Sequence, residues 1–561
     1  MAATDRFDAI VIGSGISGGF AAKELTEKGL RVLMLDRGRM VEHGEDYPYD
    51  GKPAFEVPAR DMMPAPLVDS DYFIATHGYI GPGNRMFYNN DRLNPYAYDD
   101  GEKFYWIRPG AVGGKSLIWG RWSFRWSPAD FEANKREGVG GDWPIRYEDV
   151  APWYSYVEKY IGVSGSREGL PQLPDSEFMP PMPMNIAEKW VKERLESACP
   201  GRKLIHTRLS NITEDKPDQG AGRSKCQLRN QCSRGCSFGA YFSTQAVTLP
   251  AARATGRLTL RSDAVVTNLE YDGKRRRVTG VRVVDAKTGQ AEVIPARLVF
   301  LCASAMASTQ ILMNSRDRTG RSHFDSSGTL GRYVMDHIFR VNISGDIPGM
   351  TEFIEYGRRP GGVYIPRFRN VGRDDELGFH RGYGYQGGAY RSPAPPVGFG
   401  ASMKHGMRRY AGWRFGIGAF GECLPYEDNR VSLHPDKVDR FGVPLMRFDV
   451  RFRDNELRMM DDARTQGEAM LRAAGLTNVQ SEQKEHVPGD AIHEMGGARM
   501  GVDPRSSVLN GWSQAHDAAN LFVTDGAQMA SVSCVNPSLT FMAMTARAAD
   551  HAVKQVQAGT I

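Results

Sequence analysis

DAIVIGSGISGG, residues 8–19, begins a strand–turn–helix–strand unit from which the fold can be deduced. A β-branched run leads into a glycine turn, an alanine-rich helical segment continues to about Lys28, and a second apolar run ends at Asp36. This order is typical of a dinucleotide-binding unit. Gly13 permits the tight turn, Gly15 lets the backbone approach a pyrophosphate, and Gly18 lets the helix pack on the strand. Asp36 is the candidate acceptor for an adenosine ribose. The unit suits FAD and NAD alike.

Length and composition narrow the class of protein. With 561 residues, the chain is long enough for two domains. A net charge of +5 gives no reason to expect nucleic-acid binding, and the basic run at 274–277 lies beside Asp272-Gly273 as a solvated hairpin tip. No apolar run approaches the 18 or so residues of a membrane span, and the N-terminus lacks a charged region followed by an apolar one.

Periodicity predicts the remaining elements. The region 41–100 has little periodicity and predicts a surface excursion or lid. Helices are expected within 142–162 and over 186–197, 304–314 and 454–474, and strands over 258–260, 264–271, 278–284 and 291–301.

A change of composition marks a second domain at 340–484. Alternating stretches such as 415–420 and 447–452 predict an antiparallel sheet there. Glycine-rich sequence returns afterwards, at 493–501. We therefore predict an α/β protein with a discontinuous Rossmann-like dinucleotide-binding domain at 1–339 and 485–561, and an inserted α+β substrate domain at 340–484.

Three of the seven cysteines are clustered. Cys226, Cys232 and Cys236 fall within eleven residues of a polar loop, 225–239, that also carries Arg229 and Arg234. Three thiolates can ligate iron, and the arginines would help to hold an anionic cluster. The alternatives are zinc, for which a fourth ligand is not evident, or one disulfide with a spare thiol.

Several motifs in this order resemble the glucose-methanol-choline (GMC) family of FAD-dependent alcohol oxidoreductases. They are the first glycine loop, a second loop at Gly113-Gly114-Lys115-Ser116, the segment 303–312, Gly331–His337 with its Asp336-His337 end, the His493 segment, and Asp525-Gly526 with Asn536-Pro537. The resemblance implies FAD rather than NAD. The cofactor-binding residues that it implies are Gly13, Gly15, Gly18, Asp36, Arg37, Gly113, Gly114, Lys115, Ser116, Val265, Asp525, Gly526, Asn536, Pro537 and Thr540.

The sequence departs from the family pattern at three points. Trp119 stands where the family commonly has Asn or His, and Asp36 stands where the ribose ligand is usually Glu. No histidine lies within 113–126, where some relatives attach the flavin covalently, so we expect non-covalent FAD.

Alcohol oxidation needs a base for the hydroxyl proton and an acceptor for the hydride. The resemblance makes His493 the base, Asn536 the residue that orients the hydroxyl, and flavin N5 the hydride acceptor. Without the resemblance, a structural role in a glycine-rich turn would be the better interpretation of His493, and Asn536 could be a turn residue or an N-cap. His337 and His486 are interpreted as structural.

The cysteine spacing resembles the iron–sulfur loop of bacterial sugar dehydrogenases in this family, which carry a 3Fe-4S cluster. Overall likeness points to the glucoside 3-dehydrogenases, which make 3-keto sugars. Glucose 1-dehydrogenase, gluconate 2-dehydrogenase and polyol dehydrogenases are alternatives, as is a non-catalytic electron-transfer subunit. Candidate residues for stacking on a pyranose are Tyr72, Phe73, Tyr79, Trp119 and Trp122.

Such catalytic chains pair with a small accessory subunit that carries the export signal. We therefore expect a sugar or glycoside substrate, such a partner, and cytochrome c or a quinone as electron acceptor. The expected location is periplasmic, or membrane-associated on the periplasmic side through the partner, with the cytoplasm as the alternative.

Overall fold

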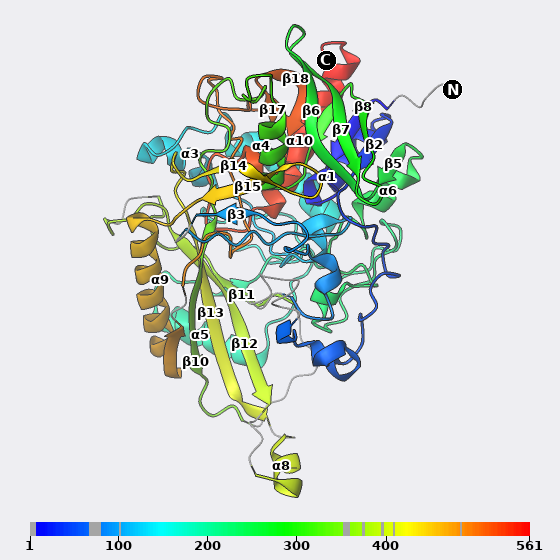
Figure 1. The fold of residues 1–561 in the computed structure, drawn as a ribbon. Helices are drawn as coiled ribbons and strands as arrows, with labels where there is room; N and C mark the ends of the chain where they lie inside the picture. The colour runs from blue at the N-terminus through cyan, green and yellow to red at the C-terminus, as the bar shows by residue number, and fades with distance from the viewer. Residues whose placement is uncertain are drawn as a thin grey trace.

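A computed structural model describes residues 7–66, 80–99, 102–351, 360–372, 376–393, 398–407, 410–482 and 485–561. Two six-stranded sheets lie toward opposite ends of the molecule (Figure 1). Among the helices within these ranges, none combines the length and apolar composition needed to cross a membrane. The predicted stacking residues Tyr72, Phe73 and Tyr79 lie outside the described residues.

The first sheet is built on the N-terminal unit. Its strands run in the order β17-β18-β9-β1-β2-β5, and all neighbours are parallel except β17 and β18. Parallel strands buried on both faces read as continuous apolar runs, as β1 and β2 do. The bounds are β1 Ala9–Ile12, β2 Val32–Leu35, β5 Leu258–Arg261, β9 Val299–Leu301, β17 Gln514–Ala515 and β18 Ala518–Val523.

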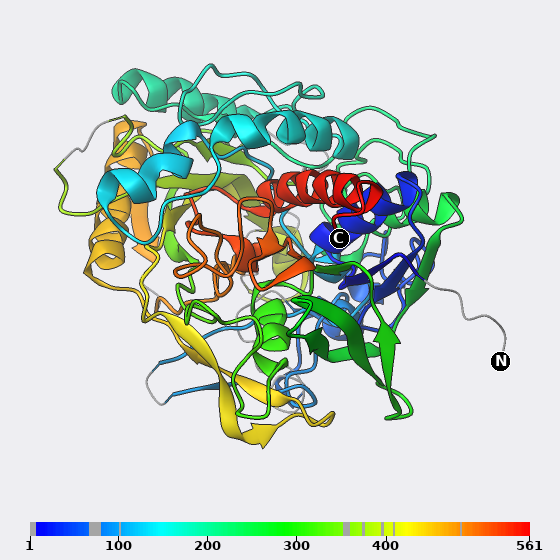
Figure 2. The same cartoon turned by 90° about the horizontal axis from the view of Figure 1, so that it is seen from above.

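Helices cover one face of this sheet, and a small antiparallel sheet packs against it. The helices α1 (Ile16–Glu27), α6 (Thr248–Ala254) and α10 (Ser538–Gln557) contribute alanine-rich faces to one core with β1 and β2. Seen from above, α10 lies beside α1 and α4 (Tyr147–Ile161), and α3 (Pro128–Glu137) precedes α4 (Figure 2). The small sheet contains β6 (Ala264–Asp272), β7 (Arg277–Asp285) and β8 (Ala291–Pro295).

One predicted strand was wrong. The run 291–301 is two strands, because β8 pairs with β7 in the small sheet whereas β9 pairs with β1 and β18 in the first sheet. A continuous apolar run cannot show that the chain changes sheets between them. The next helix, α7 (Ala305–Asn314), starts where predicted.

The second large sheet is antiparallel throughout, with the order β16-β10-β13-β12-β11-β4. Helices α5 (Ile186–Ala198) and α9 (Asp454–Ala473) pack on one face, where Tyr385, Phe415 and Ile417 are buried. A last helix, α8 (Gly400–Met407), lies at the tip. The strands are β4 Ile205–His206, β10 His337–Asp346, β11 Val363–Ile365, β12 Tyr383–Pro393, β13 Tyr410–Glu422 and β16 Thr477–Glu482.

Packing crosses the predicted domain boundaries at 340 and 484. α5 and β4 precede residue 340 but belong to the core of the second large sheet. Conversely, β14 (Arg430–Val438) and β15 (Pro444–Asp449) contribute Val431 and Phe448 to the hydrophobic core that contains Ile10 and Ile12 of β1, and β15 pairs with β3 (Ala97–Tyr98). Together the elements form an α/β protein of the predicted class.

The described parts of 41–100 form a small core of their own. Val41, Tyr47, Ile80, Phe87 and Tyr88 are buried there with residues of the 107–117 segment. Among the described residues of this segment, short 3₁₀ turns lie at 54–56, 58–61 and 85–87. The Tyr47 ring lies directly against Gly235, so the segment adjoins the cysteine loop.

Candidate active site

A cavity of about 860 Å³ opens at the carboxyl ends of β1 and β2. Ligands of open parallel sheets bind at this edge, and the volume lies within the usual range for small-molecule sites. We call it the first cavity. Of the predicted site residues, its lining includes Gly13, Gly15, Asp36, Arg37, Gly114, Lys115, Val265, His493, Asp525, Gly526, Asn536 and Pro537.

The first glycine loop has the local geometry that its sequence predicts. Gly13 has φ +96°, a conformation that favours glycine. A Cβ on Gly18 would come within 1.9 Å of the Gly13 carbonyl oxygen, so Gly18 serves helix–strand packing behind the cavity. A Cβ on Gly15 would meet nothing within 4 Å, because this residue faces open space at the start of α1. The loop therefore leaves room for a phosphate group at a helix N-terminus.

The second glycine loop lies directly against the first. A Cβ on Gly114 would come within 3.0 Å of the Gly15 Cα, and the Gly113 amide donates to Ser14 Oγ at 2.8 Å. Ser116 Oγ donates to the Gly113 carbonyl at 2.5 Å. Gly113 and Ser116 thus hold the loop together without lining the cavity. Thr540 also lies outside the lining, with its hydroxyl 2.7 Å from that of Tyr154.

Asp36 lies at the cavity edge at the end of β2, with both carboxylate oxygens already hydrogen-bonded. Oδ2 accepts from the Ser14 amide at 2.9 Å, and Oδ1 accepts from the Gly38 amide at 2.7 Å. Burial raises the pKa of Asp36, and these hydrogen bonds oppose that rise. Oδ2 also accepts from the Ser14 hydroxyl at 2.5 Å, whereas Oδ1 can accept a second hydrogen bond, so the ribose contact stays a prediction.

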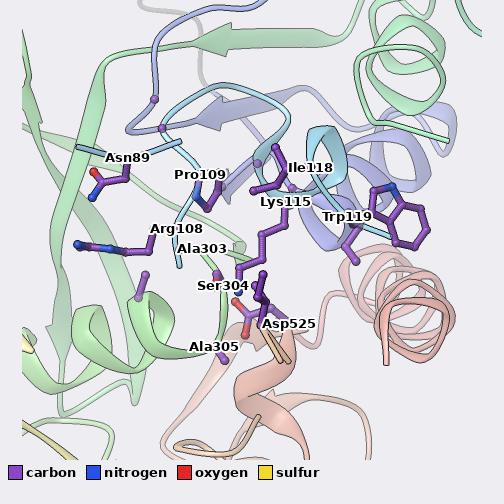
Figure 3. A pocket seen from close by; sticks show the side chains of 18 of the residues that line it. Asn89, Arg108, Pro109, Lys115, Ile118, Trp119, Ala303, Ser304, Ala305 and Asp525 are labelled. Atoms are coloured by element: carbon purple, nitrogen blue, oxygen red, sulfur yellow. The ribbon is translucent and has the colours of Figure 1, made fainter. Parts of the chain in front are cut away.

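Lys115 crosses the first cavity, and its side chain extends toward Ser304 and Asp525 (Figure 3). Its ammonium forms an ion pair with Glu494, which is almost fully buried. Burial also raises the pKa of Asp525 to about 6, against hydrogen bonds from Ser308 and the Ala527 amide. The pairing of Lys115 with Glu494 was not predicted, although Glu494 directly follows His493 in the sequence.

His493 and Asn536 meet at the other end of the cavity. Asn536 Nδ2 lies 3.2 Å from His493 Nε2, and both residues line the cavity. Burial lowers the pKa of His493 well below its ordinary value of 6.5, and His337 and Lys115 lower it further. The imidazole is therefore neutral near pH 7 and can accept a proton.

Two further side chains contact this pair. His337 Nδ1 lies 3.0 Å from His493 Nδ1, and Gln386 Nε2 donates to Asn536 Oδ1 at 2.6 Å. His337 was predicted to be structural, and Gln386 was not singled out. The signal for His337 was the Asp336-His337 pair within the quoted motifs, whereas nothing local distinguishes Gln386.

A second cavity, of about 1250 Å³, adjoins the first over the free face of the antiparallel sheet. Polar groups along it include Asn342, Ser344, Gln480 and Ser481. The residues that line both cavities are Trp122, Phe339, Gln386 and Phe420. His493 and Asn536 thus lie where a cofactor space meets a larger, polar space.

The predicted metal ligands are near one another without forming a metal site. Cys226, Cys232 and Cys236 are half-buried free thiols. Cys232 lines the first cavity, and the other two thiols have raised pKa values because of burial and the neighbouring cysteines. Across the parts of the chain that the structure describes, no three or more His, Cys, Asp or Glu side chains are grouped to hold a metal ion.

The cysteine loop is attached to the 41–66 segment. Arg229 forms an ion pair with Asp50 at 2.8 Å, and Arg234 forms one with Asp61 at 2.7 Å. These arginines were predicted to balance the charge of a cluster, and both are instead paired with carboxylates here.

Comparison with known proteins identifies relatives along the whole chain. Two profiles described as GMC oxidoreductase match residues 7–338 and 425–545. The chain is 29% identical to 2-methyl-1,2-propanediol dehydrogenase of Mycolicibacterium austroafricanum, over 98% of this chain and 95% of the relative. It is 27% identical to the fructose dehydrogenase large subunit of Gluconobacter japonicus, over 98% of both chains.

Solved structures share the fold. A point variant of formate oxidase from Aspergillus oryzae superposes with a TM-score of 0.60 at 14% identity, over 99% of both chains. At this identity, the likeness concerns the fold alone. It confirms the predicted α/β architecture.

Proposed function

The chain belongs to the GMC oxidoreductase family of FAD-binding enzymes that act on CH–OH groups, and on that premise we propose that it oxidises a secondary hydroxyl of a sugar or glycoside. The proposed product is a keto sugar, with C3 of a glucoside as the preferred position. The observation that carries the proposal is the His493–Asn536 pair, which lies at the junction of the cofactor space and the polar second cavity.

The residues of the first cavity fit FAD. Gly15 leaves open space at the start of α1, Asp36 lies at the end of β2, and the two glycine loops abut. Lys115 and Asp525 would lie beside the bound cofactor, which supplies the hydride acceptor for alcohol oxidation. His493 would take the hydroxyl proton at Nε2, and Asn536 would hold the hydroxyl in place by hydrogen bonding.

The second cavity suits a polyol. Each sugar hydroxyl that leaves water needs a hydrogen-bond partner, and the amide and hydroxyl groups of Asn342, Gln386, Gln480 and Ser481 can supply such partners. Trp122, which is half-buried and lines both cavities, offers a ring against which the apolar face of a pyranose can pack. A purely aliphatic alcohol would form fewer of these hydrogen bonds than a sugar.

We also propose that Cys226, Cys232 and Cys236 bind an iron–sulfur cluster of the 3Fe-4S type. Two observations support this: the spacing of the cysteines in the sequence, and the raised pKa values of Cys226 and Cys236, to which the neighbouring thiols contribute. The grouping needed to hold a metal is not formed in the described residues, so no electron-transfer step is derived through a cluster. Iron and sulfide analysis of purified protein, with electron paramagnetic resonance, tests the proposal. Flavin without iron would reject it.

We also propose a partner subunit, a periplasmic location and an electron acceptor. The relative named as a large subunit supports an accessory subunit, which would carry the export signal to the periplasm, and cytochrome c or a quinone would be the final acceptor. Co-purification of a small signal-bearing protein is the expected result. Complete activity toward the physiological acceptor by the isolated chain would contradict it.

Product analysis tests the enzymatic proposal. Purified protein is incubated with a methyl glucoside and an artificial electron acceptor, and the product is identified by NMR. We expect a 3-keto glucoside. A lactone from glucose or a 2-keto acid from gluconate would support the alternative sugar dehydrogenases, and oxidation of 2-methyl-1,2-propanediol alone would reject the sugar substrate. Failure to reduce bound flavin with any alcohol would favour the non-catalytic subunit.

A further inference from the structure

We propose that His337 and Gln386 are positioning residues at the two ends of a directed chain of hydrogen bonds, and that this chain leaves Nε2 of His493 as the unprotonated ring nitrogen facing the first cavity. The proposal deepens the proposed function, on which it rests through the role of His493 as the base. It assigns a task to two side chains that the sequence did not connect with catalysis.

The direction of the chain is determined at His337. Its Nε2 lies 2.8 Å from the backbone carbonyl oxygen of Ser533. A carbonyl oxygen only accepts hydrogen bonds, so Nε2 of His337 must carry the hydrogen. His337 is fully buried, and burial lowers its pKa to about 4, so the ring is neutral. A neutral imidazole has one N–H, and Nδ1 of His337 is therefore an acceptor.

His493 must then donate to His337. The two Nδ1 atoms lie 3.0 Å apart, and because that of His337 accepts, that of His493 carries the hydrogen. The second ring nitrogen of a neutral His493 consequently has no hydrogen. This nitrogen, Nε2, is the atom that faces Asn536.

The other end of the chain agrees with this direction. An amide NH₂ group only donates, so the 2.6 Å contact from Gln386 Nε2 requires the oxygen of Asn536 at that position. Asn536 then presents its own NH₂ to His493 Nε2 at 3.2 Å. Reversal of the whole chain is impossible, because the Ser533 carbonyl cannot donate.

The backbone beside His493 is held by the neighbour of His337. One oxygen of Asp336 accepts from the His493 amide at 3.0 Å, and the other accepts from the amides of Gly489 and Ala491 at 2.8 and 3.2 Å. Ile492, within this turn, has φ +63°, a strained value for a β-branched residue. Adjacent residues, Asp336 and His337, therefore hold the main chain and the ring of the base.

This arrangement specifies the proton transfer. The substrate hydroxyl displaces the Asn536 N–H from the Nε2 lone pair of His493. The substrate O–H bond then breaks, its electron pair stays on oxygen, and the Nε2 lone pair forms the new N–H bond with the proton. The ring becomes an imidazolium whose Nδ1–H bond to neutral His337 is now charge-assisted and therefore stronger. His337 needs to accept no proton itself, which makes it a positioning residue.

Other charged groups around His493 also influence its titration. Lys115 opposes protonation of His493, and Glu494 offsets Lys115 through their ion pair. Asp336 contacts the backbone amide of His493, and Asp525 interacts with Lys115. None of these groups determines which ring nitrogen carries the hydrogen, so the tautomer distinguishes the effect of His337 from theirs.

The decisive pair of variants is His337→Leu and His337→Asn. Leucine removes the acceptor, whereas the Asn oxygen can replace Nδ1 of the imidazole. We expect His337→Leu to slow flavin reduction by about 10–100-fold and to shift the acid limb of the pH profile to lower pH, because the imidazolium loses its partner. His337→Asn should recover the rate to within about fivefold of the parent. His516→Leu, which removes a hydrogen-bonded histidine outside both cavities, is the matched control.

The tautomer is measured directly in resting protein. Histidine-selective ¹⁵N labelling should show His493 protonated at Nδ1 and not at Nε2, with assignment by loss of the signals in His493→Ala. Nε2 protonation in the parent would overturn the proposal whatever the rates. Parent-like rates and pH limbs in His337→Leu would also overturn it. If none of the tested alcohols reduces the flavin of the parent protein, the proposed function is refuted, whereas the tautomer result still stands.

Gln386 gives a test that avoids the buried histidine. Gln386→Leu leaves the Asn536 amide free to rotate. In Gln386→Glu, the carboxylate accepts from the NH₂ group of Asn536, so the Asn536 oxygen turns toward His493 and favours the tautomer with the hydrogen on Nε2. We expect the plateau rate at high pH to fall in the order parent, Gln386→Leu, Gln386→Glu, with about tenfold between the extremes. Equal plateaus would remove Gln386 from the chain. Because Gln386 also lines the second cavity, the rates are compared at saturating substrate, so that a change in substrate affinity does not affect the comparison.

Discussion

One end of the first cavity is formed by backbone and the other end by side chains. The end at Gly13 and Gly15 is made of backbone from one continuous segment, whose shape depends on the absence of side chains. The end at His493 is made of side chains from segments far apart in the sequence, joined by hydrogen bonds. Substitutions that crowd packed backbone at the first end should therefore disrupt folding, whereas substitutions at the second end should lower the rate while the protein still folds.

The largest effect is expected at the backbone-built end. Gly18→Ala places a Cβ 1.9 Å from the Gly13 carbonyl oxygen, which belongs to rigid backbone. We expect loss of soluble, flavin-containing protein, measured by yield and by flavin absorbance. Gly412→Ala, where a Cβ would meet nothing within 4 Å, is the control and should fold normally. Normal flavin content in Gly18→Ala would show that the two ends do not differ in this way.

The next effect lies at the side-chain-built end. His493→Ala should fold and bind FAD but reduce it about 100–10,000 times more slowly, because the base is lost. Stopped-flow absorbance measures the rate, with His516→Ala as the control. A rate of flavin reduction close to that of the parent would reject the role of His493 as the base. It would also reject the expectation that the side-chain end of the cavity controls the rate.

A smaller effect separates folding from cofactor binding within the glycine loop. Gly15→Ala adds a methyl group to open cavity space rather than to packed backbone. We expect normal folding and FAD affinity that is about 5–150-fold weaker, corresponding to about 1–3 kcal/mol of crowding. Titration of apoprotein with FAD measures this. Unchanged affinity would mean that the cofactor does not approach Gly15.

The smallest effect concerns stability and pH. Folding holds His337 neutral, with its pKa lowered to about 4, whereas the unfolded chain binds a proton near 6.5. Below pH 6.5 the unfolded state therefore binds more protons, and stability falls as the pH falls toward 4. Between pH 6.5 and about pH 5, this residue should account for about 1.5 kcal/mol of lost stability.

The matched measurement is urea unfolding of the parent and of His337→Asn at both pH values. The variant should lose about 1.5 kcal/mol less than the parent over this interval. The same pH dependence in both proteins would show that His337 titrates as it does in the unfolded chain.

The sequence was sufficient where neighbouring residues determine the geometry. The glycine loop, Asp36 and the strand run at 9–12 lie within thirty residues, and each was predicted correctly as structure. The split of 291–301 into β8 and β9 was missed, because both strands are apolar and their sheets are defined by distant partners.

The end of the first cavity that contains His493 was only partly predictable, because its contacts also join residues that are distant in the sequence. His493 and Asn536 were identified through the family resemblance, whereas Gln386 lies on an alternating strand where its neighbours give no functional signal. The contact between Lys115 and Glu494 joins residues 379 positions apart. No local pattern encodes such pairs, since they arise from the tertiary fold.

The strand order of the first sheet has a consequence for biosynthesis. β9 lies between β1 and β18, so the N-terminal strand completes its sheet only after residue 523 has been made. A nascent chain released earlier carries an intact glycine loop but an open sheet edge, which is prone to pair with other chains. The free edge of β9 therefore stays open until nearly the whole polypeptide has been made, and chaperone shielding during translation should matter more here than the early position of the motif suggests.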